Sequence, residues 1–106
     1  MSYPRYFAVQ SVFYQDNDER YYYAMDFDSP GQLADGDTIS GTPVVASEVR
    51  GGGTSDLVIE EVTTSGLYVF MWVSSGTPHK SYKVEVRANT LNGASIEGDG
   101  FIRIGD

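Results

Sequence analysis

Cysteine is absent from this 106-residue chain, and histidine occurs once, as His79. A disulfide framework is therefore excluded, and a structural zinc site would lack the Cys and His ligands that it needs. Without such cross-links the chain has to close one hydrophobic core, because two domains of about fifty residues each would be marginal. The sequence predicts a single globular domain, and the lack of cysteine agrees with synthesis in a reducing cytoplasm.

Basic residues are also scarce, with seven Lys and Arg against fifteen Asp and Glu, a net charge of -8 and a pI near 4.3. Such a chain repels phosphate backbones and anionic lipids, so we expect neither nucleic acid nor a membrane as a partner. The longest apolar run, Leu67–Val73, is far shorter than the roughly 20 residues of a membrane-spanning helix. Residues 1–7 lack the apolar core of a signal peptide, so we expect the chain to stay in the cytoplasm or to be assembled there into something larger.

Twelve glycines and four prolines separate short runs rich in Val, Ile, Tyr and Phe. No ten-residue window shows the i, i+3, i+4, i+7 spacing of a helix, so the pattern predicts an all-β fold. Seven to eight short strands at this spacing favour an antiparallel β-sandwich of the immunoglobulin or fibronectin type III kind. The expected strands are Tyr6–Tyr14, Arg20–Phe27, Asp37–Ser40, Val44–Val49, Leu57–Val62, Leu67–Val73, Ser81–Ala88 and Ile96–Ile104.

Several glycines have specific expected roles. Asn92-Gly93 predicts a tight hairpin between the last two strands, because both residues tolerate positive φ. The runs at 51–53 and 98–100 lack the Lys-Ser/Thr of a phosphate-binding loop and precede no helix. We interpret both as hairpin or bulge glycines.

Two strands carry most of the information on the core. The segment Ser81–Ala88 alternates strictly between apolar and charged residues, which indicates one buried and one solvated face. In Leu67–Val73 both faces are apolar, and one of them consists of Tyr68, Phe70 and Trp72. Two interpretations stay open: the aromatic face is covered by a loop or by the N-terminal segment, or it meets another subunit.

Tyr82 begins a strand after the turn at Gly76-Thr77, a position at which fibronectin-like sandwiches tie a tyrosine back to the backbone. We assign Tyr82 this structural role, the tyrosine corner. There is no Cys-Trp-Cys arrangement, so an antibody-type domain is not supported.

The N-terminal segment, residues 1–14, has apolar groups on both faces of a possible strand. We expect either an interaction arm added to one sandwich domain at 15–106 or the first strand of that domain's own sheet, and both hold if the strand lies at an edge. The candidate interface residues are Tyr6, Phe7, Val9, Val12, Phe13, Tyr68, Phe70 and Trp72.

Catalytic and metal-binding patterns are weak. His79 has Ser74, Ser75 and Ser81 near it in sequence, but nothing marks an activated nucleophile, so we interpret it as an exposed turn residue and expect no enzyme. Seven acidic residues lie between positions 16 and 37, yet the spacing of a calcium loop is missing, so we expect no metal and no cofactor. Tyr21, Tyr22, Tyr23 and Trp72 would suit a carbohydrate-binding module, which stays an alternative.

A longer pattern covers about residues 15–104. It consists of Asp26-Phe27-Asp28, Leu33-Ala34-Asp35-Gly36-Asp37-Thr38-Ile39-Ser40, Ser75-Gly76-Thr77, Tyr82-x-Val84-x-Val86, Asn92-Gly93 and Ile102-x-Ile104. With these motifs the chain resembles small structural proteins of tailed bacteriophages, the fibre-tail adaptor family. The resemblance implies a single sandwich domain that serves as a non-catalytic joint in the virion.

We therefore expect a virion structural protein, assembled in the cytoplasm of the bacterial host, that acts as an oligomeric connector at the tail, the neck or the fibre attachment site. Its expected partners are other virion proteins and further copies of itself. The leading alternative is a capsid decoration protein of the phage head, and the second alternative is the carbohydrate-binding module.

Overall fold

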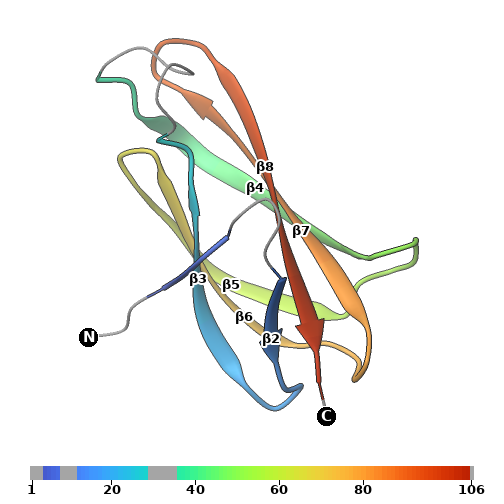
Figure 1. Ribbon diagram of the computed structural model, residues 1–106. Coiled ribbons are helices and arrows are strands. Elements are labelled where there is room, and N and C mark those ends of the chain that lie inside the picture. Colours follow the sequence, from blue (N-terminus) through green and yellow to red (C-terminus); the bar gives the residue numbers. More distant parts are fainter. Residues whose placement is uncertain (1–3, 8–11, 29–35, 106) are drawn as a thin grey trace.

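The computed structural model describes residues 4–7, 12–28 and 36–105. These residues form eight strands and no helix, which confirms the all-β prediction (Figure 1). No helix of the described residues is therefore long and apolar enough to cross a membrane. The strands are β1 (Arg5–Tyr6), β2 (Val12–Gln15), β3 (Arg20–Asp26), β4 (Ile39–Val49), β5 (Leu57–Ser65), β6 (Tyr68–Ser75), β7 (Ser81–Thr90) and β8 (Ser95–Ile104).

The strands form two four-stranded sheets. The first sheet has the order β1-β3-β6-β5 and the second sheet the order β2-β8-β7-β4. The predicted sandwich is confirmed, whereas its immunoglobulin-like character stays a prediction. The pairs among β3 to β8 are antiparallel, but β1 pairs in parallel with β3, and β2 in parallel with β8. The sheets are therefore mixed rather than purely antiparallel, because each N-terminal strand lies beside a strand of the same direction.

The single strand expected at Tyr6–Tyr14 is in fact two strands, one in each sheet. Phe7 lies in the core, 7% exposed, with its ring stacked on Tyr23 at a centroid distance of 5.0 Å. Phe13 packs edge-on against the same Tyr23 ring at 5.6 Å. The segment can join both sheets because it carries apolar groups on both of its faces.

The two strands expected at Asp37–Ser40 and Val44–Val49 are parts of one strand, β4. Its register against β7 shifts between Ser40 and Val44. Gly41, with φ of 76°, lies in this irregular stretch. An extra residue in one strand of a pair is a β-bulge, which bends a strand without ending it.

The core lies between the sheets and confirms both predicted alternations. The inward-facing residues of β6 and β7, from Val69 to Val73 and from Tyr82 to Val86, are fully buried. Burying a side chain of this kind contributes about 1.5–3 kcal/mol. The core cluster comprises Phe7, Tyr23, Met25, Phe27, Val69, Met71, Val73, Tyr82, Val84, Val86, Ile102 and Ile104.

The expectation for glycines 98 and 100 was wrong, because both lie in the middle of β8 rather than in a hairpin or bulge. A Cβ at Gly100 would overlap the ring of Phe7, and one at Gly98 would lie 2.8 Å from Sδ of Met25. Each glycine thus leaves space for a large side chain from the opposite layer. Glycines 51–53 do form a turn with positive φ, as expected.

The predicted hairpin at Asn92-Gly93 is confirmed, since β7 and β8 pair antiparallel up to Asn89 and Ser95. Thr90 N–H donates to the Ala94 carbonyl at 2.9 Å and closes the loop. Gly93 has a φ of 91°, whereas Asn92 does not have the positive φ expected for a tight two-residue turn.

Candidate interaction surface

The outer face of the first sheet carries a row of stacked rings, Tyr68, Phe70, Tyr22 and Trp72, which we call the aromatic row. Centroid distances are 6.0 Å between Tyr68 and Phe70, 5.7 Å between Phe70 and Tyr22, and 4.9 Å between Tyr22 and Trp72. The register sets this geometry, because Tyr22 lies directly opposite Trp72 on neighbouring strands. All four side chains are partly exposed, so this face of the sheet is apolar and accessible to solvent.

Ala24 lies next to the row, and its small side chain leaves room for the neighbouring rings. It faces outward opposite Phe70, yet it is fully buried. Tyr6 of β1 is paired with Ala24 and packs edge-on against Tyr68 at 6.2 Å. The small Ala24 side chain therefore leaves space that the neighbouring rings cover, and Tyr6, 50% exposed, extends the aromatic surface onto the edge strand.

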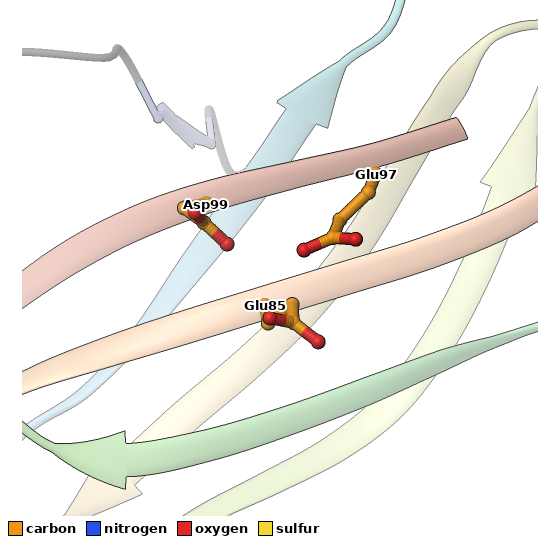
Figure 2. Close-up of side chains that lie close together, drawn as sticks. All are labelled: Glu85, Glu97 and Asp99. Atoms are coloured by element: carbon orange, nitrogen blue, oxygen red, sulfur yellow. The ribbon is translucent and has the colours of Figure 1, made fainter. Parts of the chain in front are cut away.

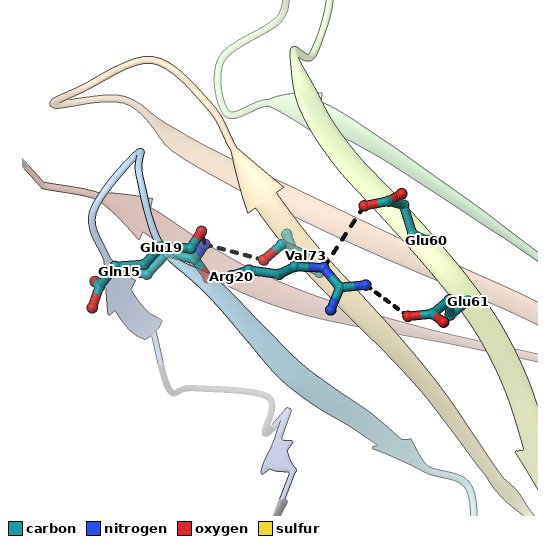
Figure 3. Close-up of polar contacts among 6 residues, drawn as sticks. All are labelled: Gln15, Glu19, Arg20, Glu60, Glu61 and Val73. Carbon is teal, nitrogen blue, oxygen red and sulfur yellow. Dashed lines mark hydrogen bonds and ion pairs between the residues drawn. The ribbon is translucent and has the colours of Figure 1, made fainter.

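One end of the row holds a cation. The guanidinium of Arg20 lies 4.4 Å from the Trp72 ring centroid. It pairs with Glu61 at 2.6 Å and with Glu60 at 3.8 Å, as Figure 3 shows. These groups are largely exposed, so the pairs add little stability. Their effect is to orient Arg20 over the indole.

The two glutamates reach Arg20 together because β5 has an irregular register between Glu60 and Thr63. Glu61 has a φ of 53°, in the left-handed region that a residue other than glycine seldom adopts. Bulges of this kind redirect a side chain, and here adjacent residues point to the same cation.

The other end of the row is acidic. Asp26 lies opposite Tyr68, and its Oδ1 accepts the N–H of Asp28 at 2.7 Å. The pKa of the Tyr68 phenol is raised above its ordinary value. The negative charge of Asp26 is the largest cause, and burial and the charge of Asp28 add to it. Both aspartates are exposed, so their negative charge lies at the surface beside the ring.

The structure separates the residues that the sequence grouped as interface candidates. Tyr68, Phe70, Trp72 and Tyr6 share the outer face described above. Phe7 belongs to the core, so it is not available to a partner, and its expected place at an interface is wrong. Val12 and Phe13 are half-buried, with Phe13 packed against the core, and Val9 lies outside the described residues.

The three consecutive tyrosines also separate. Tyr23 is fully buried, and Tyr21 packs against the core beneath the guanidinium of Arg5, at 3.6 Å. Of the three, Tyr22 alone joins the aromatic row with Trp72. Strand alternation in Arg20–Phe27 was the signal that could have placed Tyr22 and Arg20 on one face of their own strand, opposite the face of Tyr21 and Tyr23.

A buried polar group joins the two sheets near the N-terminus. The Tyr23 hydroxyl donates to Oε1 of Gln15 at 2.6 Å. Gln15 Nε2 donates in turn to the Val73 carbonyl at 3.3 Å (Figure 3). Arg5 donates to the same Tyr23 oxygen at 3.2 Å. Burial raises the pKa of Tyr23 to about 12. Sequence reasoning missed this cluster, since its members are distant in the chain.

Tyr82 is fully buried at the start of β7. Its hydroxyl accepts the Thr77 N–H at 2.7 Å and donates to Oδ1 of Asp56 at 2.5 Å. Hydrogen bonds from the Thr77 and Tyr82 side chains lower the pKa of Asp56. The contact ties backbone five residues upstream to the core, which is the geometry described for a tyrosine corner, and the motif assignment stays a prediction.

Among the described residues, one acidic cluster has carboxylate oxygens within 4.8 Å of one another, namely Glu85, Glu97 and Asp99 (Figure 2). It lies on the outer face of the second sheet and not in the stretch 16–37. Arg87 pairs with Glu85 at 2.8 Å and with Glu97 at 3.7 Å, and Lys83 is 3.9 Å from Glu85. These basic side chains already offset much of the negative charge.

In the acidic stretch 16–37, Asp37 accepts hydrogen bonds from the backbone instead of joining a cluster of carboxylates. Asp37 is buried, and its carboxylate accepts the N–H groups of Thr38 and Asn92 at 2.9 and 3.1 Å. The hydrogen bonds from Thr90 and from these backbone groups lower the pKa of Asp37. The carboxylate thus holds the β7–β8 loop, while Asp35 lies outside the described residues.

His79 lies in the exposed turn before β7, with φ of 70°, and its N–H donates to the Ile104 carbonyl at 2.7 Å. It borders a hollow of about 420 Å³ together with Val49, Arg50, Lys80, Ser81 and Arg103. The Ser81 hydroxyl accepts a hydrogen bond from Arg103 at 3.2 Å.

Fold and surface together define a small β-sandwich protein with an aromatic outer face on one sheet. A family model described as podophage GP4 fiber-tail adaptor protein gp77 matches residues 15–103, and the chain belongs to this family of bacteriophage structural proteins. The resemblance drawn from the sequence motifs is thereby confirmed. The match begins at the last residue of β2, so β1 and most of β2 lie outside it. No curated protein matches the chain.

Proposed function

We propose that the protein is a non-enzymatic connector of the phage virion that binds other tail or fibre proteins through the aromatic row. The observation that carries this proposal is the partly exposed stack of four rings on the outer face of a sheet. Tyr, Trp and Phe are enriched at protein interfaces, where they bury a large area. Family membership supports the tail or fibre as the place of action and a structural role.

Docking in this proposal combines side-chain packing with backbone pairing between copies or neighbours. The strand order leaves β5 and β4 at the edges of the two sheets, and β1 and β2 at the opposite edges. Edge strands present unpaired backbone groups to which another chain can add a strand. We propose that residues 1–14 add such contacts at the edge, in an oligomer of this chain.

The two alternatives have less support. Capsid decoration requires contacts over the head lattice, whereas the family name refers to the fibre and the tail. A sugar-binding module needs exposed ring faces, but the rings of the row are stacked on one another and Trp72 also lies under Arg20. A glycan array tests the sugar alternative: saturable binding to one glycan that is lost in Trp72→Ala would favour it.

Imaging of particles that lack this protein tests the proposal. Density missing at the tail, the neck or the fibre base, together with loss of the neighbouring component, is the expected result. Density missing over the head lattice would favour decoration, and intact particles would contradict a connector role. His79→Ala provides a control for the non-enzymatic role, since we expect it to assemble normally.

A further inference from the structure

Both ends of the aromatic row carry a ring and two carboxylates, but the carboxylates are paired with a basic side chain at one end only. At the Trp72 end, Arg20 lies over the ring and pairs with Glu60 and Glu61. At the Tyr68 end, the ring has Asp26 opposite it and Asp28 two residues further along the chain. In the described part of the chain neither aspartate forms an ion pair. Each end of the row thus has an aromatic ring with two carboxylates near it. Among the residues described, a guanidinium lies between the ring and the carboxylates at the Trp72 end only.

The charges around the row favour a partner of a particular charge. Four carboxylates, those of Asp26, Asp28, Glu60 and Glu61, lie beside the row, and among the described residues Arg20 is the one cation placed there. Asp26 lies opposite Tyr68 and is the main cause of the raised pKa of the Tyr68 phenol, so negative charge lies close to this end of the row. A guanidinium or ammonium group is attracted both by carboxylates and by aromatic faces, and more strongly once it leaves water.

We infer that the Tyr68 end of the aromatic row binds an arginine or lysine side chain of a partner protein segment that lies along the row. The inference rests on the proposed function, because it names the chemistry of the partner at the same surface. Arg20 over Trp72, held by two glutamates, shows the same type of arrangement within the chain. The partner is therefore basic where it meets this face.

A second copy of the chain is a poorer occupant. Each copy carries a net charge of -8, so a second copy that docks on this face brings more negative charge to a surface that is already acidic. Like charges across an interface disfavour association and select against that pairing. Complementarity of charge thus favours a different, basic protein over self-association through the row.

The first experiment uses Trp72 as a reporter, since it is the only tryptophan of the chain. A synthetic peptide of alternating valine and arginine is titrated against the full-length protein, and a valine–glutamate peptide of equal length serves as the control. We expect the arginine peptide alone to change the Trp72 fluorescence, with weaker binding as salt is added. Asp26→Asn/Asp28→Asn should weaken its binding by roughly tenfold, equivalent to about 1.4 kcal/mol.

A matched variant controls for the loss of two negative charges. Glu97→Gln/Asp99→Asn makes the same change on the outer face of the second sheet, and we expect binding as in the unmodified protein. Asn at position 26 keeps an oxygen that can accept the Asp28 N–H, so the local backbone contact is retained. Equal binding of both peptides, or equal weakening by both double variants, would overturn the inference.

The second experiment measures incorporation of the same variants into phage particles that lack the natural protein. Reduced incorporation of Asp26→Asn/Asp28→Asn alone supports the inference. Normal incorporation of this variant, combined with loss in Trp72→Ala, would overturn the inference and leave the proposed function standing. Normal incorporation of Trp72→Ala as well would contradict both, and self-association of the purified protein that Trp72→Ala abolishes would identify a second copy as the occupant.

Discussion

The Tyr23 hydroxyl on β3 of the first sheet donates a 2.6 Å hydrogen bond to Oε1 of Gln15 on β2 of the second sheet. Tyr23 is fully buried and Gln15 is 3% exposed, so the bond crosses the interior of the sandwich. It links β2 of the second sheet to β3 of the first sheet without any covalent bond. In a chain that has no cysteine, such buried polar contacts help to specify how the two sheets are positioned.

Tyr23→Phe should therefore lower the free energy of unfolding by about 1–3 kcal/mol, because the buried Gln15 oxygen loses its donor. Urea unfolding followed by Trp72 fluorescence measures the change. Tyr14→Phe is the matched control, since Tyr14 is 67% exposed, and we expect almost no effect. Equal stability of Tyr23→Phe and the unmodified protein would show that the buried hydrogen bond contributes nothing.

Alkaline pH should weaken the same contact. Burial raises the pKa of Tyr23 from 10.0 to about 12, so the folded state favours the neutral phenol. This contribution to stability is complete below the unfolded pKa near 10.0 and is lost as the pH rises through the folded pKa of about 12. The melting temperature should fall less steeply over this interval in Tyr23→Phe than in the unmodified protein, and parallel curves would contradict the assignment.

Gly100→Ala tests the packing of the N-terminal segment. Its new Cβ would overlap the buried Phe7 ring, so we expect a loss of about 1–3 kcal/mol in the free energy of unfolding. Gly98→Ala is the control, because its nearest atom is the flexible Met25 thioether and the expected loss is smaller. A larger loss in Gly98→Ala than in Gly100→Ala would contradict the packing described for Phe7.

Tyr82→Phe should destabilise the connection between β6 and β7. The Thr77 N–H loses its acceptor and Asp56 loses a donor, which we expect to cost about 1–3 kcal/mol. In a double-mutant cycle with Asp56→Ala, which removes the acceptor, the two changes should be non-additive, because the groups share one hydrogen bond. Additive losses in urea unfolding would show that the Tyr82 hydroxyl and Asp56 act independently.

The sequence predicted the parts of the fold that depend on local alternation. Tyr82 to Val86 and Val69 to Val73 face the core as expected, since an apolar residue at every second position fixes one face of a strand. The same rule failed at Gly98 and Gly100, because a glycine shows no side chain and its environment comes from the opposite layer. The split of the N-terminal segment was likewise missed, since apolar groups on both of its faces fit one sheet or two.

The candidate surface was predicted in part. Tyr68, Phe70 and Trp72 were recognised as an unusual apolar face from their own strand. Tyr22 and Arg20 join them only through the register of β3 against β6, which a single sequence does not reveal. The bulge that brings Glu61 to Arg20 is equally a product of pairing between strands.

The most direct test of the account compares two matched variants in phage particles. Trp72 in the aromatic row lies under Arg20 at 4.4 Å, and Phe101 on the second sheet lies under Arg50 at 4.5 Å. The measurement is the number of copies incorporated per particle for Trp72→Ala and for Phe101→Ala, with folding of each variant checked by its unfolding curve. The account predicts a loss of incorporation for Trp72→Ala and normal incorporation for Phe101→Ala, and equal incorporation of the two folded variants would contradict it.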